Sequence, residues 1–476
     1  MTNMHRPAIS SALVAVGSVL AATATLLLPA LWNKAPFYYW DSVDYIYLPF
    51  SWDLPVYRTV GYGVFAGIGR LAGTIWAVIL VQTVLTVYVI RETLAVFAPL
   101  HPDRLLVPLA LVLTALTGLP WAAGQLMPDA LTGLIVLGLA TLAFGGNRPW
   151  WTRWPLAAAT LVAVSVHSSH ILLGIGLVSV LAVLMLAGRL MRSELRLRMA
   201  LPAMTIVAAM TLVIALHWVT QGRPQLVQSP SVLLLARLVQ DKIAKRFLDD
   251  HCKGEGPYML CRYRDRLPTT ANAFLWERDS IVEQLGGWTR LEQEAELIFE
   301  RSLFVYPGAH LLAALQLTGE QLVRLRTGDG ISNELAWLIT DTLKQYYPRD
   351  FEAFTASRQA VGIDFEPLNT FQVPLALGIT LVMLLAMPLA WRRRDLRMAG
   401  LTTTVALSLI GNALICGVLS NPSDRYQNRL IWLSFVVVSI AACPVALAVA
   451  QSRTRRRRTS RMAAFGEYSG SGDGVD

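Results

Sequence analysis

Residues 201–219 read LPAMTIVAAMTLVIALHWV and contain no Asp, Glu, Lys or Arg. An uncharged apolar run of this length matches the roughly 20 residues that an α-helix needs to cross a bilayer. The sequence therefore predicts an all-α polytopic membrane protein with about ten transmembrane helices. Its other apolar runs lie at about 8–31, 74–90, 105–119, 130–144, 156–166, 171–187, 373–391, 398–419 and 430–450.

The composition excludes an ordinary soluble domain, because 54% of the 476 residues are hydrophobic and only 15% are charged. The net charge of +9 does not indicate nucleic-acid binding, since that function needs a basic face on a folded surface. The arginines instead form short runs between apolar segments, which is typical of cytoplasmic loops. These runs are Arg148 and Arg153; Arg189, Arg192, Arg196 and Arg198; Arg392–Arg394 and Arg397; and six arginines within 453–461.

Ten spans and a cytoplasmic N-terminus place all four arginine clusters on the cytoplasmic side. The sequence thus predicts an integral protein of a bacterial inner or plasma membrane, with both termini cytoplasmic. Residues 1–219 are expected to form an N-terminal transmembrane bundle with an acidic first outer loop (32–73). Residues 220–371 form an outward-facing, mainly helical region, 372–451 the C-terminal transmembrane helices, and 452–476 a basic, disordered cytoplasmic tail.

The charge distribution supports this division. Residues 221–370 contain 17 Lys and Arg but 20 Asp and Glu, a net charge of −3, so the rest of the chain carries +12. Between Arg58 and Thr74 the chain is rich in glycine and includes Arg70, which makes it a poor span and predicts a juxtamembrane helix along the outer surface.

The first outer loop reads Ala35-Pro-Phe-Tyr-Tyr-Trp-Asp-Ser-Val-Asp-Tyr45. One carboxylate of the pair Asp41 and Asp44 could act as general base on an acceptor hydroxyl, and the other could orient it or help to hold a divalent cation. The alternative is that both are solvated loop charges or helix caps.

Further along, Tyr57-Arg58-Thr-Val-Gly61-Tyr62 combines an arginine suited to phosphate with a glycine that lets the backbone approach an anion. Arg58 could equally reach lipid headgroups from the membrane edge. Near the chain's other end, Asp424-Arg425-Tyr426-Gln-Asn-Arg429 opens the last span. Arg425 and Arg429, four residues apart, predict either a phosphate cradle with Tyr426 or an interfacial anchor with Asp424 as the helix cap.

Three further residues on the outward face are candidates for contact with a polar substrate. Asp129 follows Met-Pro and either lines a site or caps a helix. His167 and His170 are three residues apart, and two histidines without carboxylate partners do not make a metal site. The two histidines are therefore not predicted to bind a metal ion.

The four cysteines divide into two pairs. Cys416 and Cys443 lie in apolar runs and are expected to be small buried side chains. Cys252 and Cys261 lie in the polar region, where they would form a disulfide if that region is extracytoplasmic, or remain two thiols.

Together, the acidic outer loop, Tyr-Arg-Thr-x-Gly-Tyr, Met-Pro-Asp and Arg-Tyr-Gln-x-Arg resemble the membrane glycosyltransferases of the C-type fold, such as the protein O-mannosyltransferases and the aminoarabinose transferases of lipid A. The resemblance covers mainly the first 130 and the last 60 residues. The acids of the family signature are adjacent or one residue apart, whereas Ser42 and Val43 separate them here, and Gly63 stands where the family commonly has proline.

The resemblance implies a polyprenyl-phosphate-linked sugar donor, an outward active site and inversion at the sugar carbon. Asp41 would be the base, Asp44 its helper, and Arg58 and Arg425 the ligands of the donor phosphate. The expected activity is transfer of a hexose or pentose to a lipid, glycan or protein acceptor, with membrane lipids as the surroundings. A transporter or flippase for a polyprenyl-linked glycan would instead place ionisable groups or broken helices near the midplane. A polymerase or ligase using similar donors is a third alternative. The sequence leaves the sugar, the acceptor and the oligomeric state open.

Overall fold

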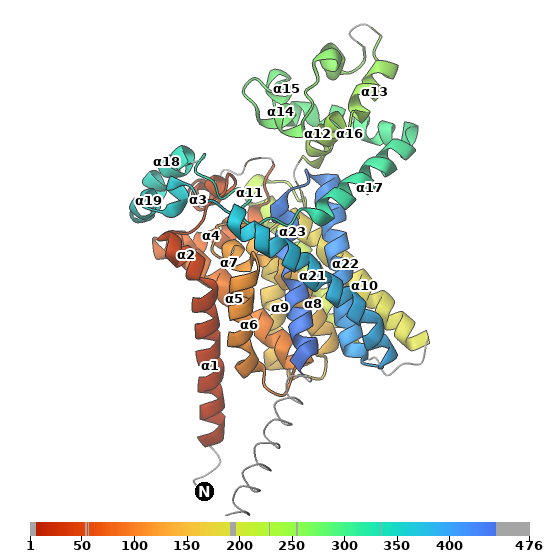
Figure 1. The fold of residues 1–476 in the computed structure, drawn as a ribbon. Coiled ribbons are helices and arrows are strands. Elements are labelled where there is room, and N and C mark those ends of the chain that lie inside the picture. Colours follow the sequence, from red (N-terminus) through yellow and green to blue (C-terminus); the bar gives the residue numbers. More distant parts are fainter. Residues whose placement is uncertain are drawn as a thin grey trace, which may run out of the picture.

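The computed structural model describes residues 6–52, 55, 57–190, 197–227, 229–253, 256–334 and 336–443. Within these residues every regular element is a helix and no strand is present (Figure 1), which confirms the predicted all-α class. The first helices are α1 (Arg6–Leu26), α2 (Leu28–Asn33), α3 (Ser42–Ser51), α4 (Val60–Ala72), α5 (Trp76–Phe97), α6 (Pro102–Leu116), α7 (Leu119–Ala123), the 3-10 helix η1 (Pro128–Leu131), α8 (Thr132–Phe144), α9 (Trp150–Ser165), α10 (Ser168–Leu190) and α11 (Ala200–Gln221).

The later helices follow in the same order along the chain. They are α12 (Pro230–Gln240), α13 (Ile243–His251), η2 (Met259–Arg266), α14 (Ala271–Trp276), α15 (Ile281–Gln284), α16 (Trp288–Val305), α17 (Pro307–Val323), α18 (Ala336–Tyr346), α19 (Pro348–Thr355), α20 (Arg358–Val361), α21 (Glu366–Arg392), α22 (Leu396–Leu419) and α23 (Asp424–Ile431). The predicted tail 452–476 lies outside the described residues, as do Arg192 and Arg196.

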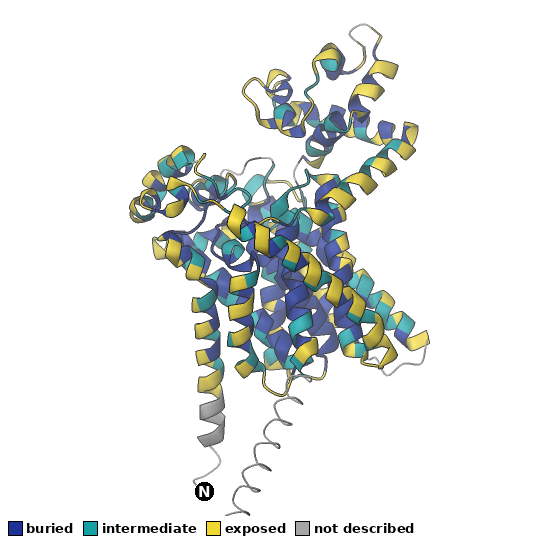
Figure 2. Ribbon diagram, in the orientation of Figure 1, coloured by how far each residue is buried: buried dark blue, intermediate teal, exposed yellow. Residues whose placement is uncertain are grey.

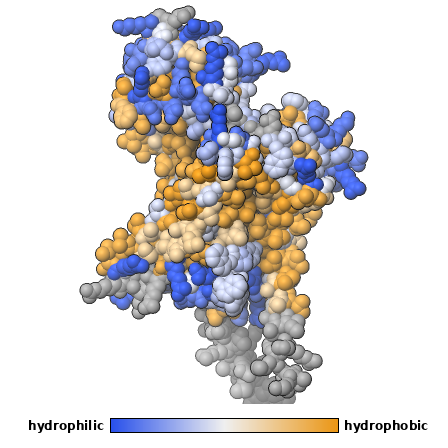
Figure 3. Space-filling view, turned by 180° about the vertical axis from the view of Figure 1, so that it is seen from behind, coloured by the Kyte–Doolittle hydropathy of each residue, from blue (hydrophilic) through white to orange (hydrophobic). Residues whose placement is uncertain are grey.

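Six described stretches are long and apolar enough to cross a membrane: α5, α10, α11, α21, α22 and Asp424–Cys443. In α21 only 11% of the most apolar window is buried inside the protein. Soluble proteins rarely expose so large an apolar surface. Figure 3 shows the consequence, an apolar band across the middle of the molecule with polar side chains above and below it. These features indicate an integral membrane protein.

The centre of the bundle is α8, whose thirteen residues are all buried. It is apolar all round, as a helix without a solvent face must be. Helices α5, α9, α10 and α22 pack around it, and Figure 2 shows this interior in dark blue inside a more exposed outer layer. A short break lies near His167, because α9 ends at Ser165 and α10 begins at Ser168.

The two ends of the bundle differ in charge and in structure. At the end that carries the N-terminus, Arg148 pairs with the buried carboxylate of Glu92 at 2.5 Å, and Arg198 donates to Asn147 at 3.2 Å. Arg392–Arg394 and Arg397 are exposed, and Gly400 beyond them lies against Phe144, the last residue of α8. Basic loops from distant parts of the chain thus meet at one end, while α2–α4 and α23 lie at the other (Figure 1).

Residues 220–371 contain two separate structures. Helices α12–α16 enclose a hydrophobic core of their own between Val232 and Tyr306; with α17 we call this the outer lobe. Helices α18–α20 instead belong to the main core through Leu343, Tyr347 and Phe354. In the outer lobe Cys252 and Cys261 form a disulfide, which settles the alternative left open by the sequence. At Pro307 α16 gives way to α17.

Candidate functional site

Asp41 and Asp44 lie at the start of α3, three residues apart, and therefore on one face of the helix. Both bind the same partner. Arg58 donates from Nη2 to Asp41 at 2.5 Å and from Nε to Asp44 at 2.6 Å. Asp41 occupies the N-cap position, but its side chain makes no capping hydrogen bond. The irregular spacing of the acids is thus what a helix needs to direct two carboxylates at one guanidinium, and the alternative of solvated or capping charges does not describe them.

The residues around the pair hold the first loop against the bundle. Ser42, between the two acids, accepts a hydrogen bond from the amide of Tyr39 at 2.8 Å and donates to the carbonyl of Leu126 at 2.9 Å. Phe37 and Gln125 form a single parallel β-bridge. These contacts tie the first loop to the segment that leads into η1, and so bring Asp41 close to Asp129.

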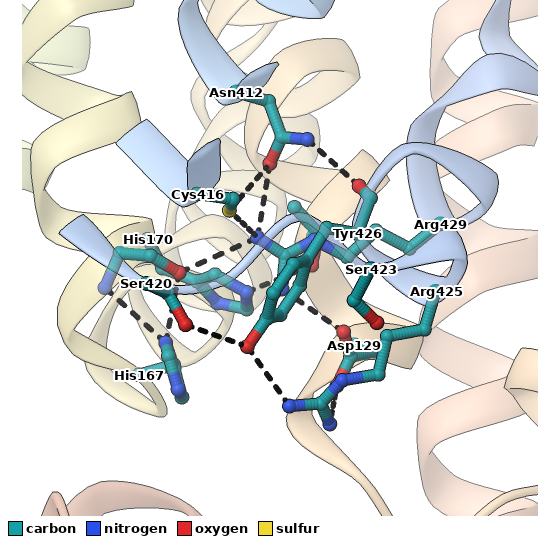
Figure 4. Close-up of polar contacts among 12 residues, drawn as sticks. Asp129, His167, His170, Asn412, Cys416, Ser420, Ser423, Arg425, Tyr426 and Arg429 are labelled. Carbon is teal, nitrogen blue, oxygen red and sulfur yellow. Dashed lines mark hydrogen bonds and ion pairs between the residues drawn. The ribbon is translucent and has the colours of Figure 1, made fainter. Parts of the chain in front are cut away.

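Asp129 belongs to η1 and is almost fully buried. The helix begins after Met127, so Asp129 is not its cap. Its carboxylate instead accepts from Nη1 of Arg429 at 2.9 Å and lies 3.7 Å from Nη1 of Arg425. Arg429 is itself only 3% exposed and points into the protein, which rules out the interfacial anchor expected as one alternative from the sequence (Figure 4).

Arg425 connects the two acidic groups. Its Nη1 lies 3.7 Å from Asp41 and 3.7 Å from Asp129 without forming a hydrogen bond, while its Nη2 donates to the hydroxyl of Tyr426 at 3.0 Å. Its guanidinium carbon stands 4.3 Å from the ring centre of Tyr39 and 4.7 Å from that of Tyr426. Because Nε and Nη1 have no hydrogen-bond partner, that edge of the guanidinium stays available for a planar anion. We use the name ion cluster for Asp41, Asp44, Arg58, Asp129, Arg425 and Arg429.

The ion cluster joins residues from the two ends of the chain and is largely withdrawn from solvent. Three carboxylates are matched by three guanidinium groups, so their desolvation is offset by ion pairing. Burial raises the pKa of Asp44 above its usual value, while the adjacent Arg58 opposes that rise. Burial also raises the pKa of Tyr39 to about 12, so this phenol stays neutral at physiological pH.

Three predicted site residues lie beside the ion cluster rather than in it. His167 is half-buried, with Nδ1 2.8 Å from the hydroxyl of Ser169, which lies 3.4 Å from Arg429. His170 is fully buried, with its two ring nitrogens at the carbonyl of Ala163 and the hydroxyl of Thr132. Tyr62 is also fully buried and donates to Gln82 at 2.9 Å. The geometry of His170 and Tyr62 is that of satisfied core residues.

Gly61 has a different role from the expected one. A Cβ atom at this position would lie 1.9 Å from the carbonyl oxygen of Ser165 at the end of α9. Glycine is therefore required because α4 approaches another backbone, not because an anion approaches α4.

The donor set does not fit a divalent cation at Asp41 and Asp44 in this arrangement. Both carboxylates pair with Arg58, which stands where a shared cation would. In the part of the chain that the structure describes, no group of three or more His, Cys, Asp or Glu side chains could hold a metal ion.

Sequence reasoning missed several residues that support the arginines. Asn412 and Cys416 on α22 contact Nη2 of Arg429, at 2.9 Å to the amide oxygen and 3.2 Å to sulfur. Asp329 accepts from the amide of Arg425 at 3.1 Å. A single polar Asn inside an apolar run was a signal for Asn412. Nothing in the sequence distinguishes Cys416 from an ordinary buried cysteine.

Two cavities lie near this end of the bundle, and neither contains an ion-cluster residue. One, of about 620 Å³, is an apolar space between α2, α7 and α21 whose walls include Trp32, Trp121 and Phe371. The other, of about 390 Å³, adjoins it and is lined in part by Lys34 and Arg358.

We compared the chain with known protein families, curated proteins and solved structures. No family model, no curated protein and no solved structure matches this chain. The resemblance to the C-type membrane glycosyltransferases accordingly stays a prediction from short motifs, and the chemistry of the ion cluster has to be argued from its own geometry.

Proposed function

We propose that this protein is an integral membrane glycosyltransferase that moves a hexose or pentose from a polyprenyl-phosphate donor to an acceptor on the outer face of the membrane. The observation that carries the proposal is the ion cluster, in which a carboxylate pair and three arginines from opposite ends of the chain converge. Carboxylates supply a general base and arginines bind a phosphate, and transfer from a phosphate-linked sugar needs both.

The topology we propose has about ten spans, with the ion cluster and the outer lobe outside and both termini in the cytoplasm. Helices α1, α6, α8 and α9, which are shorter or less apolar than the six candidates, supply the remaining four spans. Two observations support the orientation. The basic loops share the opposite end of the bundle, as cytoplasmic loops do. The disulfide of the outer lobe suits an oxidising, extracytoplasmic compartment.

In the proposed reaction Asp41 takes the proton of the acceptor hydroxyl. The oxygen attacks the sugar carbon from the side opposite the phosphate, the carbon–oxygen bond to phosphate breaks, and polyprenyl phosphate leaves with the electron pair. Arg58 and Arg425 neutralise the negative charge that develops on the leaving phosphate. Arg58 donates to Asp41 at 2.5 Å, so a phosphate that recruits Arg58 would release Asp41 to act as base.

The apolar cavity between α2, α7 and α21 is a suitable place for the prenyl chain. Trp121 in its wall packs at 5.2 Å against Phe37, which belongs to the same loop as Asp41. The non-enzymatic alternative, a transporter or flippase, has less support, because α3 and α23, which carry most of the ion cluster, lie at one end of the bundle (Figure 1).

Binding of undecaprenyl phosphate to the full chain in nanodiscs, followed by native mass spectrometry, tests this proposal. We expect Arg58→Gln to weaken binding by about tenfold or more, because a charge-assisted contact to phosphate is lost. Arg324→Gln is the matched control, since Arg324 directly follows α17, is partly exposed and pairs with Glu320 one turn away. If Arg58→Gln bound undecaprenyl phosphate as tightly as the native protein, Arg58 would not be a ligand of the donor phosphate.

A further inference from the structure

The outer lobe contributes an aromatic cluster directly beside the ion cluster. Tyr57, from the segment before α4, packs its ring at 4.8 Å from Trp276 and 5.4 Å from Trp288, and the two tryptophans lie 5.2 Å apart. Trp276 ends α14 and Trp288 begins α16. We call these three residues the aromatic triad. It brings together two parts of the chain whose relation the sequence does not show.

The local backbone is built to present Trp288. Gly286 and Gly287 have φ angles of 92° and 90°, a conformation that side chains other than glycine rarely adopt. A Cβ atom at Gly287 would meet no atom within 4 Å, so conformation rather than space requires the glycine. This turn ends the preceding segment and lets α16 begin with its first ring against Trp276.

The triad is continuous with the ion cluster. The guanidinium carbon of Arg58 stands 5.1 Å from the ring centre of Tyr57, while its nitrogens bind Asp41 and Asp44. A ligand resting on the aromatic rings would therefore lie next to the carboxylate pair. Burial and the neighbouring carboxylates raise the pKa of Tyr57, so its hydroxyl remains protonated and able to donate.

The aromatic triad is accessible to solvent. Trp276 keeps 49% of its surface exposed, and Glu277, Arg278 and Asp279, which follow it directly, are exposed as well. A sugar ring has an apolar face of C–H groups and a rim of hydroxyls, so it stacks on an electron-rich aromatic face and hydrogen-bonds to charged groups at the edge. The three charged residues beside Trp276 favour a ligand that carries hydroxyl groups over a lipid chain.

From this geometry we propose that the aromatic triad is the acceptor subsite and binds a sugar residue of a glycan, whose hydroxyl it directs toward Asp41 and Asp44. The inference rests on the proposed glycosyltransferase function and narrows its acceptor from lipid, glycan or protein to a carbohydrate. It also gives the outer lobe, which matches no motif, a role in selecting the acceptor.

A glycan array probed with the full chain in fluorescent nanodiscs tests the inference. The native protein is expected to bind at least one immobilised glycan, and Trp276→Ala to weaken that binding by about tenfold or more, as loss of a large aromatic anchor does. Trp276→Phe should retain most of the binding because it keeps an aromatic face. Trp276→Leu, which preserves apolar packing against Tyr57 and Trp288, should bind as weakly as Trp276→Ala.

The matched control is Trp337→Ala, because Trp337 is also a largely exposed tryptophan but lies on α18. Native protein that binds no glycan, or a Trp276→Leu variant that binds as well as the native protein, would overturn the inference. Undecaprenyl phosphate binding should be unchanged in Trp276→Ala. The two proposals can therefore fail separately. If the acceptor subsite is wrong, the Trp276 variants bind glycan as the native protein does; if the proposed function is wrong, Arg58→Gln still binds undecaprenyl phosphate.

Discussion

Asp41→Asn is expected to abolish glycosyl transfer while leaving the protein folded. The amide can still accept the hydrogen bond that Arg58 donates at 2.5 Å, but it cannot take a proton from an acceptor hydroxyl. Loss of a general base lowers a rate by about 10²- to 10⁴-fold. In cells of the source organism the lipid-linked sugar should therefore accumulate, and untargeted mass spectrometry of extracted polyprenyl-phosphate sugars would detect it whichever sugar the lipid carries.

Two variants make this result specific. Asp44→Asn should cause a smaller accumulation, because Asp44 orients Arg58 and is not itself the proposed base. Asp341→Asn, at an exposed carboxylate on α18, should leave the lipid pool as in native cells. All three proteins should elute as the native protein does in size-exclusion chromatography. A normal lipid pool in the Asp41→Asn strain, with the protein present at native amounts, would refute the assignment of Asp41 as base.

Arg429→Leu should cause the largest loss of stability among single substitutions at the site. Arg429 and Asp129 are both nearly fully buried and pair at 2.9 Å. Removing one partner of such a pair leaves a buried charge and costs about 3–5 kcal/mol. The thermal midpoint in detergent should fall by about 3–5 °C, because the shift equals the lost free energy divided by the unfolding entropy of a chain of this length.

A double variant separates the charge from the packing. Arg429→Gln combined with Asp129→Asn removes both charges and keeps hydrogen-bonding groups, so it should recover part of the lost stability. Arg324→Leu, at a partly exposed ion pair at the end of α17, should shift the midpoint little. If Arg429→Leu were as stable as the native protein, this result would contradict the buried ion pair between Arg429 and Asp129.

The sequence is a good guide to elements whose pattern is local. Apolar runs predicted the helices of the bundle, and a glycine-rich stretch with Arg70 predicted the separate helix α4. The sequence also predicted that the arginine-rich loops share one end of the bundle. Arginine next to a transmembrane helix is a local signal, because it marks the end of that helix that faces the cytoplasm. The sequence also singled out Asp41, Arg58, Asp129 and Arg425, which lie together in the ion cluster, since each interrupts an apolar or aromatic context.

What the sequence could not give is the direction in which a side chain points. Arg429 opens an apolar helix, and the same pattern describes an arginine that reaches lipid headgroups and one that turns inward to Asp129. Gly61 shows the same limitation, because its neighbour, the carbonyl of Ser165, is distant in sequence. The contact of Tyr57 with Trp276 depends on how the outer lobe packs on the bundle, for which no local pattern exists.

The most direct test of the central claim is an experimental structure of the full chain in nanodiscs with undecaprenyl phosphate bound. The account predicts phosphate oxygens at about 2.7–2.9 Å from the guanidinium groups of Arg58 and Arg425. It also predicts that Arg58 has moved away from Asp41 and that the prenyl chain lies in the apolar cavity between α2, α7 and α21. A head group bound instead between Lys34 and Arg358, with the ion cluster unchanged, would contradict the account.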